Sequence, residues 1–127
     1  GLVEALQWLG RQFSSNTGIP VTFTSTESII KADENISICI FRVYQEALTN
    51  ITKHAAAGNV WGSLTCENGF VCLSIKDDGK GFDPDTLKNN FTFGIIGLKE
   101  RVTALRGVFE LSSSPGNGTV ITVKIPV

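Results

Sequence analysis

Three polar residues, Glu46, Asn50 and Lys53, follow one another at intervals of four and three in a segment with helical apolar spacing. At roughly 100° per residue, Asn50 falls within the apolar arc of this helix, and the other two border it. An amide oxygen suits a hard cation such as Mg²⁺, and a glutamate can orient or deprotonate a nucleophile. The alternative is a set of hydrogen bonds or ion pairs on the helix surface, and the helix considered by itself favours that alternative.

A second candidate is Asp77, which is followed by the glycine-rich sequence of residues 78 to 81. Asp77 shares the parity of the apolar residues in the preceding strand, so its side chain is expected to face the core and that of Asp78 to face outward. An inward carboxylate beside bare glycine backbone can accept a hydrogen bond from the exocyclic amine of a purine. The same residue types also occur in plain hairpin turns, and the motif alone leaves both interpretations open.

Two further glycines, Gly94 and Gly97, are expected at the point where a long loop, residues 77 to 97, enters a helix. Free backbone N–H groups and the helix dipole could face a phosphate there, although helix-entry glycines also occur without a ligand. A loop of this length in a compact domain favours a functional role. The sequence contains neither the P-loop nor the dinucleotide-binding fingerprint nor the Gly-x-Ser-x-Gly elbow, so other nucleotide-binding architectures remain.

The elements that must position these residues follow from hydrophobic periodicity and turn signals. Helices are predicted over Leu2–Phe13, from an N-cap at Asp33 to about Ala57 with Gly58 as its stop, and from Leu98 to a cap at Gly107; strands are predicted over Ile19–Thr24, Val60–Cys66, Phe70–Lys76, Val108–Ser113 and Thr119–Ile125.

The most specific local prediction is a β-hairpin with a two-residue turn at Asn68-Gly69. This turn pairs Glu67 with Phe70 and places Cys66 and Cys72 on opposite faces of the hairpin. A disulfide between these two cysteines is therefore disfavoured. Reduced, packed thiols are typical of a cytoplasmic protein.

Composition limits the class of protein. The 127 residues suffice for one domain, and 42% apolar against 18% charged residues indicates a folded chain. A net charge of −1 gives no long-range attraction to nucleic acid or to an anionic membrane. No apolar run approaches the roughly 20 residues of a membrane span, so we expect a soluble domain that is neither anchored nor exported by itself. Three cysteines without Cys-x-x-Cys spacing and a single histidine, His54, do not predict a structural zinc site.

Four segments, in this order and at this spacing, resemble the four ATP-site boxes of sensor histidine kinases. Residues 45–55, QEALTNITKHA, resemble the N box, and residues 77–82, DDGKGF, resemble the first glycine box. Residues 93–101, FGIIGLKER, are similar to the second glycine box, and residues 115–119, PGNGT, to the last. Within that family the resemblance is greatest to nitrate-sensor-like kinases, which pair with response regulators that carry a helix-turn-helix output domain.

The resemblance implies an α+β fold, a two-layer α/β sandwich of the GHKL or Bergerat type, shared with gyrase, the Hsp90 chaperones and MutL. It places three helices on one face of a mixed, mostly antiparallel sheet. It also implies that Glu46 assists phosphotransfer, that Asn50 ligates Mg²⁺, that Asp77 binds the adenine amine and that residues 83 to 93 form a short lid. The residues implied to contact ATP are Asn50, Lys53, His54, Asp77, Gly79, Gly81, Phe82, Gly94, Ile95, Gly97, Leu98 and Thr119.

The chain departs from the family pattern in three places. Thr92 stands where a further glycine commonly opens the second glycine box, and Asp78 replaces the more usual asparagine of the first. No phosphoacceptor histidine occurs between Gly1 and Ile36, and His54 belongs to the implied ATP pocket. Residues 1–127 are therefore expected to be a single ATPase domain excised from a longer sensor kinase.

The partners implied are ATP with Mg²⁺, an upstream dimerisation domain that carries the phosphoacceptor histidine, and a response regulator. The full-length protein is expected to be a homodimer, and whether a membrane anchors it stays open. Direct contact of this domain with nucleic acid or membrane is not expected. Two alternatives remain: a serine kinase of the anti-sigma-factor type, and a module that binds nucleotide or protein without turnover.

Overall fold

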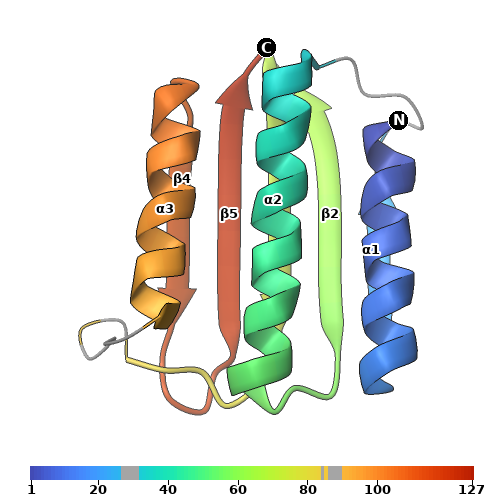
Figure 1. The fold of residues 1–127 in the computed structure, drawn as a ribbon, viewed down its shortest axis with the longest axis vertical. Coiled ribbons are helices and arrows are strands. Elements are labelled where there is room, and N and C mark those ends of the chain that lie inside the picture. Colours follow the sequence, from blue (N-terminus) through green and yellow to red (C-terminus); the bar gives the residue numbers. More distant parts are fainter. Residues whose placement is uncertain (27–31, 84, 86–89) are drawn as a thin grey trace.

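The computed structural model describes residues 1–26, 32–83, 85 and 90–127, and it forms two layers (Figure 1). One layer is a five-stranded sheet and the other is formed by three α-helices that cover one of its faces. The strands are β1 (Val21–Ser25), β2 (Val60–Glu67), β3 (Phe70–Asp77), β4 (Val108–Ser113) and β5 (Thr119–Pro126); the helices are α1 (Leu2–Thr17), α2 (Glu34–Asn50) and α3 (Asn90–Ala104), and a π-helical turn, η1 (Ile51–Ala55), continues α2.

The sheet is mixed and mostly antiparallel, as the resemblance implies. Its strand order is β1-β2-β3-β5-β4; β1 runs parallel to β2, and every other neighbouring pair is antiparallel. The parallel pair requires a crossover connection, and α2 provides it. The expected fold class is therefore confirmed.

The hairpin of β2 and β3 has the predicted register. Glu67 pairs with Phe70, and both turn residues, Asn68 and Gly69, have positive φ of 53° and 81°. Two successive residues with positive φ form the type I′ turn that matches the twist of a hairpin. Cys66 and Cys72 lie on different faces and carry free thiols.

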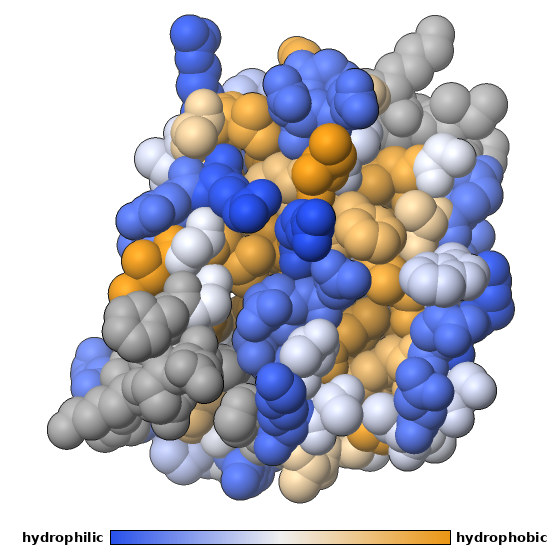
Figure 2. Space-filling model, in the orientation of Figure 1, coloured by the Kyte–Doolittle hydropathy of each residue, from blue (hydrophilic) through white to orange (hydrophobic). Residues whose placement is uncertain are grey.

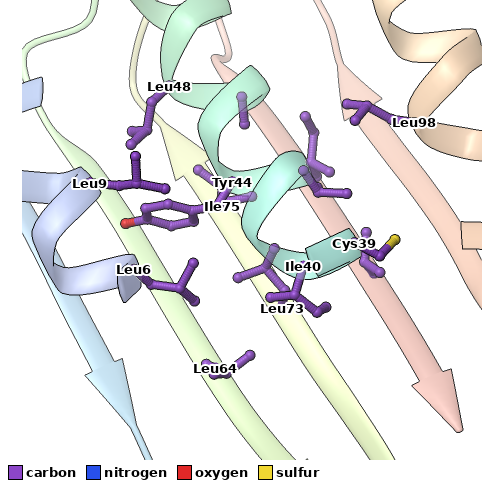
Figure 3. Close-up of a cluster of buried hydrophobic side chains, with 14 of the residues drawn as sticks. Leu6, Leu9, Cys39, Ile40, Tyr44, Leu48, Leu64, Leu73, Ile75 and Leu98 are labelled. Carbon is purple, nitrogen blue, oxygen red and sulfur yellow. The ribbon is translucent and has the colours of Figure 1, made fainter. Parts of the chain in front are cut away.

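The core lies between the helices and the inner face of the sheet. Figure 3 shows Tyr44 of α2 projecting toward Leu6 and Leu9 of α1, above the inward residues of the sheet, which include Leu64 and Leu73. Burying apolar area of this kind contributes roughly 25 cal/mol per Å² and is the main favourable term in folding. It fixes α2 across the sheet and thereby positions the polar residues at the far end of that helix.

Helix ends follow capping chemistry. The Asp33 carboxylate accepts a hydrogen bond of 2.9 Å from the backbone N–H of Ile36, so the predicted N-cap of α2 is confirmed. Helix α1 ends at Gly18, whose φ of 76° is the left-handed conformation that glycine adopts readily.

Figure 2 shows hydrophilic side chains along α2 and apolar ones between α2 and α1. None of the helices in the described part of the chain combines the length and the apolar character that a membrane-spanning helix needs.

Three predicted helix boundaries are wrong. Helix α1 continues to Thr17, through residues predicted to form a turn, rather than ending at Phe13. Helix α3 begins at Asn90 rather than at Leu98, and the α-helical part of α2 stops at Asn50, where η1 takes over. In α3 the two glycines each weaken the helix by only about 1 kcal/mol relative to alanine, which packing of the helix against its neighbours can offset. The implied lid, residues 83 to 93, lies partly outside the described residues.

Candidate functional site

The candidate residues lie at one end of the sheet, opposite the end where both termini lie (Figure 1). The carboxyl end of α2 with η1, the segment after β3, the beginning of α3 and the β4–β5 turn all reach this end. Four segments that are separated in the sequence thus converge.

Asp77, the last residue of β3, is buried with 4% of its surface exposed, as its parity predicts. Its Oδ1 accepts a hydrogen bond of 2.8 Å from the backbone N–H of Gly79. Burial raises the pKa of this carboxyl, and the neighbouring charge of Asp78 adds to the rise, whereas hydrogen bonding to the backbone of Gly79 and Thr119 opposes it. A carboxylate whose charge is compensated only by backbone amides remains able to accept a hydrogen bond from a ligand.

Asp77 is the first of a row of three polar residues that crosses the sheet. Thr119 on β5 pairs with Asp77 on one side and with Ser113 of β4 on the other. The Ser113 and Thr119 hydroxyl oxygens are 2.9 Å apart. Ser113 was not among the residues predicted from the sequence, although its parity with the half-buried Phe109 and Leu111 places it on the inner face of β4.

Contacts within the protein require a glycine at position 81. Its φ is +63°, and a Cβ at this position would clash with the Ser114 carbonyl oxygen of the β4–β5 turn. The same two segments are joined by a hydrogen bond of 2.6 Å from the Gly116 N–H to the Lys80 carbonyl. The predicted close backbone approach is therefore present at Gly81, but it is made to the protein's own turn. Gly79 is buried, and its backbone N–H donates a hydrogen bond to the Asp77 carboxylate.

The end of α2 contributes Glu46 and Asn50, both half-buried. The Nδ2 atom of Asn50 is buried and has no hydrogen-bond partner among the residues that the structure describes. Glu46 reaches α3: a Cβ built on Gly94 would lie 2.9 Å from Glu46 Oε1. An unsatisfied buried amide costs about 1–3 kcal/mol, so its retention at the end of a helix is typical of a site that a ligand completes.

The π-helical turn η1 holds the other two residues of the N-box segment. Lys53 is exposed, and His54 lies in the turn with a side chain outside the described part of the structure. Short π-helical insertions of this kind occur frequently at functional sites.

Asp78 faces outward, as predicted, and holds the segment between η1 and β2. Its carboxylate accepts hydrogen bonds of 2.8 Å from the backbone N–H groups of Gly58 and Asn59, and one of 3.0 Å from Asn59 Nδ2. These bonds lower the pKa of the carboxyl. The two adjacent aspartates thus differ in environment: one is buried at the site, and the other fastens the chain that leads away from η1.

The second glycine segment is not placed as predicted. Gly94, Ile95, Gly97 and Leu98 lie inside α3, beyond the first four residues whose N–H groups a helix leaves free. The prediction that they form the entry to the helix is therefore wrong. Gly97 faces open space, because no described atom outside its chain neighbours and the nearby backbone of its own helix lies within 4 Å of the point that a Cβ would occupy. Leu98 is buried in the core.

The structure thus brings the candidates together in two groups at one end of the fold. Asp77, Gly79, Gly81 and Thr119 form the first group, linked by the hydrogen bonds and backbone contacts given above. Phe82 joins this group because its backbone N–H donates a hydrogen bond of 3.0 Å to Ser113 Oγ. The second group is the end of α2 with α3, where Glu46 meets Gly94. Among the described residues, no three His, Cys, Asp or Glu side chains cluster as a metal site.

Comparison with known proteins identifies relatives of this arrangement. A family model described as "Histidine kinase-, DNA gyrase B-, and HSP90-like ATPase" matches residues 35–127. Over the whole chain, the sequence is 38% identical to the signal transduction histidine-protein kinase/phosphatase DegS of Brevibacillus brevis and 34% identical to the sensor histidine kinase LiaS of Bacillus subtilis (strain 168).

The chain covers 33% of that DegS and 34% of LiaS, so it spans about a third of the length of these curated relatives. Among solved structures, full-length ShkA in complex with AMPPNP superposes with a TM-score of 0.79 at 18% identity, covering 99% of this chain and 30% of that one. At this identity the superposition establishes the fold.

Proposed function

The chain belongs to the family of histidine kinase-, DNA gyrase B- and HSP90-like ATPases, and from this premise we propose that it binds Mg-ATP at the end of the sheet described above. It is an ATP-binding catalytic domain of the sensor histidine kinase type. In a longer protein it would donate the γ-phosphate of ATP to a histidine on a separate dimerisation domain. The observation that carries the proposal is the buried Asp77 carboxylate at the convergence of the four segments.

The first group of residues would hold the base. Asp77 would accept a hydrogen bond from the exocyclic amine of adenine, which relieves the unfavourable burial that raises the pKa of this carboxyl. Thr119 would contact the same edge of the base because it pairs directly with Asp77. Gly79, Gly81 and Phe82 would line the pocket, since this segment leaves β3 immediately after Asp77.

The second group would hold the phosphates and the cation. The amide oxygen of Asn50 is a suitable ligand for Mg²⁺, and its Nδ2 group, which is unpaired among the described residues, would be free to donate to a phosphate oxygen. Lys53 and His54, in the next turn, would approach the phosphates. When bound, Mg-ATP supplies the phosphoryl group and a cation that neutralises the charge developing on it.

Glu46 would act on the acceptor. Its carboxylate lies half-buried against α3, which restricts its orientation, and a positioned carboxylate can take the proton of an incoming histidine nitrogen. Catalysis by this domain would otherwise consist mostly of positioning and charge neutralisation.

Gly94, Ile95, Gly97 and Leu98 would bind the phosphates through their backbone N–H groups, which requires the first turns of α3 to open. Gly97→Ala tests this step. The methyl group has open space around it and removes the cost of glycine in a helix, so Tm should rise by roughly 2–5 °C. Because a helix stabilised by about 1 kcal/mol opens less often, the affinity for ATP should fall about fivefold.

Calorimetric titration with ATP and a thermal melt measure both effects of Gly97→Ala. The matched control is Thr103→Ala, an exposed position near the far end of the same helix, which should raise Tm without loss of affinity. Equal affinity of the Gly97→Ala variant and the original chain would contradict the opening of α3.

The partners are also proposals. Residues 1–127 would form one domain of a longer homodimeric protein that contains the phosphoacceptor histidine and that signals to a response regulator. The histidine kinases DegS and LiaS among the relatives support this assignment. Within the family we place the chain near the nitrate-sensor-like kinases, on the four motifs described above. Because ATP is a cytoplasmic nucleotide and the three thiols are free, we propose that the domain works in the cytoplasm.

The function is tested in two steps. The first is a titration of the 127-residue chain with ATP and with GTP, in Mg²⁺ and after chelation. We expect Mg²⁺-dependent binding of ATP and at least about 100-fold weaker binding of GTP, because a site built to accept an amine hydrogen rejects a carbonyl oxygen. The second uses the longer protein and measures acid-labile phosphate, which is the signature of phosphohistidine. Acid-stable phosphate on a serine would favour the serine kinase, and binding without transfer would favour the non-catalytic module.

A further inference from the structure

We propose that Ser113 is a positioning residue that fixes the Thr119 hydroxyl as a hydrogen-bond acceptor beside Asp77 and thereby sets the preference of the site for a base with an exocyclic amine. The proposal deepens the function given above and rests on it, since it concerns the same nucleotide pocket. Ser113 lies outside the four motifs of the sequence.

The Ser113 hydroxyl makes three contacts at hydrogen-bond distance. The backbone N–H of Phe82 donates to Ser113 Oγ at 3.0 Å. Ser113 Oγ lies 2.9 Å from the Gly118 carbonyl oxygen and 2.9 Å from Thr119 Oγ1. One hydroxyl therefore joins the segment after β3, the β4–β5 turn and the first residue of β5.

The direction of each bond follows from counting donors and acceptors. A serine hydroxyl has one hydrogen to donate and two lone pairs to accept with. A carbonyl oxygen can only accept, so the hydrogen of Ser113 goes to Gly118. A backbone N–H can only donate, so Phe82 occupies one lone pair. The remaining contact requires the Thr119 hydroxyl to donate its hydrogen to the second lone pair of Ser113.

Thr119 is then left without a hydrogen to offer to the pocket. Its oxygen can only accept there, and it lies on the residue that pairs with Asp77. Two acceptors side by side suit an exocyclic amine, which has two hydrogens to donate. They equally suit an amine that donates to one acceptor while a water bound to that amine donates to the other. A carbonyl oxygen at the same position of the base would meet two acceptors and find no donor.

Ser113→Ala frees the Thr119 hydroxyl to turn its hydrogen toward the pocket. We expect the ratio of ATP affinity to GTP affinity to fall about tenfold, mainly through weaker ATP binding, which corresponds to the loss of one neutral hydrogen bond. Ser113→Thr keeps a hydroxyl and should restore the ratio to within about twofold. Ser112→Ala, at the adjacent outward-facing position, is the matched control and should change neither affinity.

The measurement is calorimetric titration of the 127-residue chain and its variants with Mg-ATP and Mg-GTP, with a thermal melt for each. A purely structural role of Ser113 would lower Tm and both affinities in parallel and leave the ratio unchanged, and this result would overturn the proposal. If Ser113→Ala does not fold, Ser113→Cys, which keeps the shape of the side chain but bonds weakly, must lower the ratio instead.

The two proposals fail in different ways. An original chain that binds no ATP overturns the proposed function and this inference with it. An original chain that prefers ATP, together with a Ser113→Ala variant that keeps the full preference, overturns the role of Ser113 alone.

Discussion

Asp77→Asn is expected to lower the affinity of the chain for ATP by about 100-fold while leaving its fold intact. The substitution keeps the oxygen that accepts from the Gly79 N–H and replaces the other carboxylate oxygen by an NH₂ group. That group would face the amine of adenine, so a charge-assisted bond becomes a contact between two donors. The ratio of ATP to GTP affinity should fall as well, because guanine presents an oxygen at this position.

Although Asp77→Asn should weaken ATP binding, it should increase the stability of the fold at neutral pH. Burial raises the pKa of the Asp77 carboxyl, so the fold favours its protonated form. The ionised group therefore destabilises the fold, an effect that is absent below the ordinary value of 3.8 and grows as the pH rises through the raised pKa. The amide of the Asp77→Asn variant cannot ionise. The variant should have a higher Tm than the original chain at neutral pH, and the difference should shrink as the pH falls toward about 4.

Asp78→Asn is the matched control, since it removes the same charge from the adjacent residue. The pKa of the Asp78 carboxyl is lowered by its bonds to Asn59 and Gly58, so its ionised form stabilises the fold. This variant should lose stability at neutral pH and keep the preference for ATP. Titration calorimetry and thermal melts from about pH 4 to about pH 7 separate the two aspartates. Unchanged ATP affinity in Asp77→Asn would show that this carboxylate does not bind the base.

Asn50→Ala is expected to remove most of the Mg²⁺ dependence of ATP binding. Loss of groups that merely support a metal ligand costs about 10- to 100-fold in affinity, so loss of the ligand itself should cost about 100-fold in Mg²⁺. In excess chelator the variant and the original chain should bind ATP equally weakly. Because the variant loses a buried, unsatisfied Nδ2 and gains a better helix former, its Tm should be unchanged or higher.

The control for this variant is Gln45→Ala, which deletes an exposed amide from the same helix. It should bind Mg-ATP as the original chain does. ATP titrations at several Mg²⁺ concentrations give the dependence directly. An Asn50→Ala variant that retains the full response to Mg²⁺ would exclude this residue as the ligand.

Both substitutions share a physical signature: each removes binding without lowering stability. Asp77 and Asn50 both lie in environments that are unfavourable for their polar groups. Burial raises the pKa of the Asp77 carboxyl, and the buried Nδ2 of Asn50 is an unpaired donor. Polar groups with no stabilising role in the free protein are characteristic of binding and catalytic sites.

The sequence by itself determined whatever depends on neighbouring residues. A two-residue turn sets the register of its hairpin, and the strand period of two then assigns each side chain to a face. These rules placed Asp77 inward and Asp78 outward, and the structure agrees. The N-cap of α2 and the mixed sheet were likewise predicted, the first from local chemistry and the second from the resemblance of the four motifs.

Only the tertiary structure decided the features that depend on contacts between distant segments. The Ser113 hydroxyl meets Phe82, 31 positions away, and Gly81 must lack a side chain because the β4–β5 turn packs against it. The start of α3 depends on whether packing offsets the weak helix propensity of its glycines, which propensity alone cannot show. Periodicity and turn chemistry act over a few residues, whereas the contacts of Ser113 and Gly81 arise from the pairing of β3, β5 and β4.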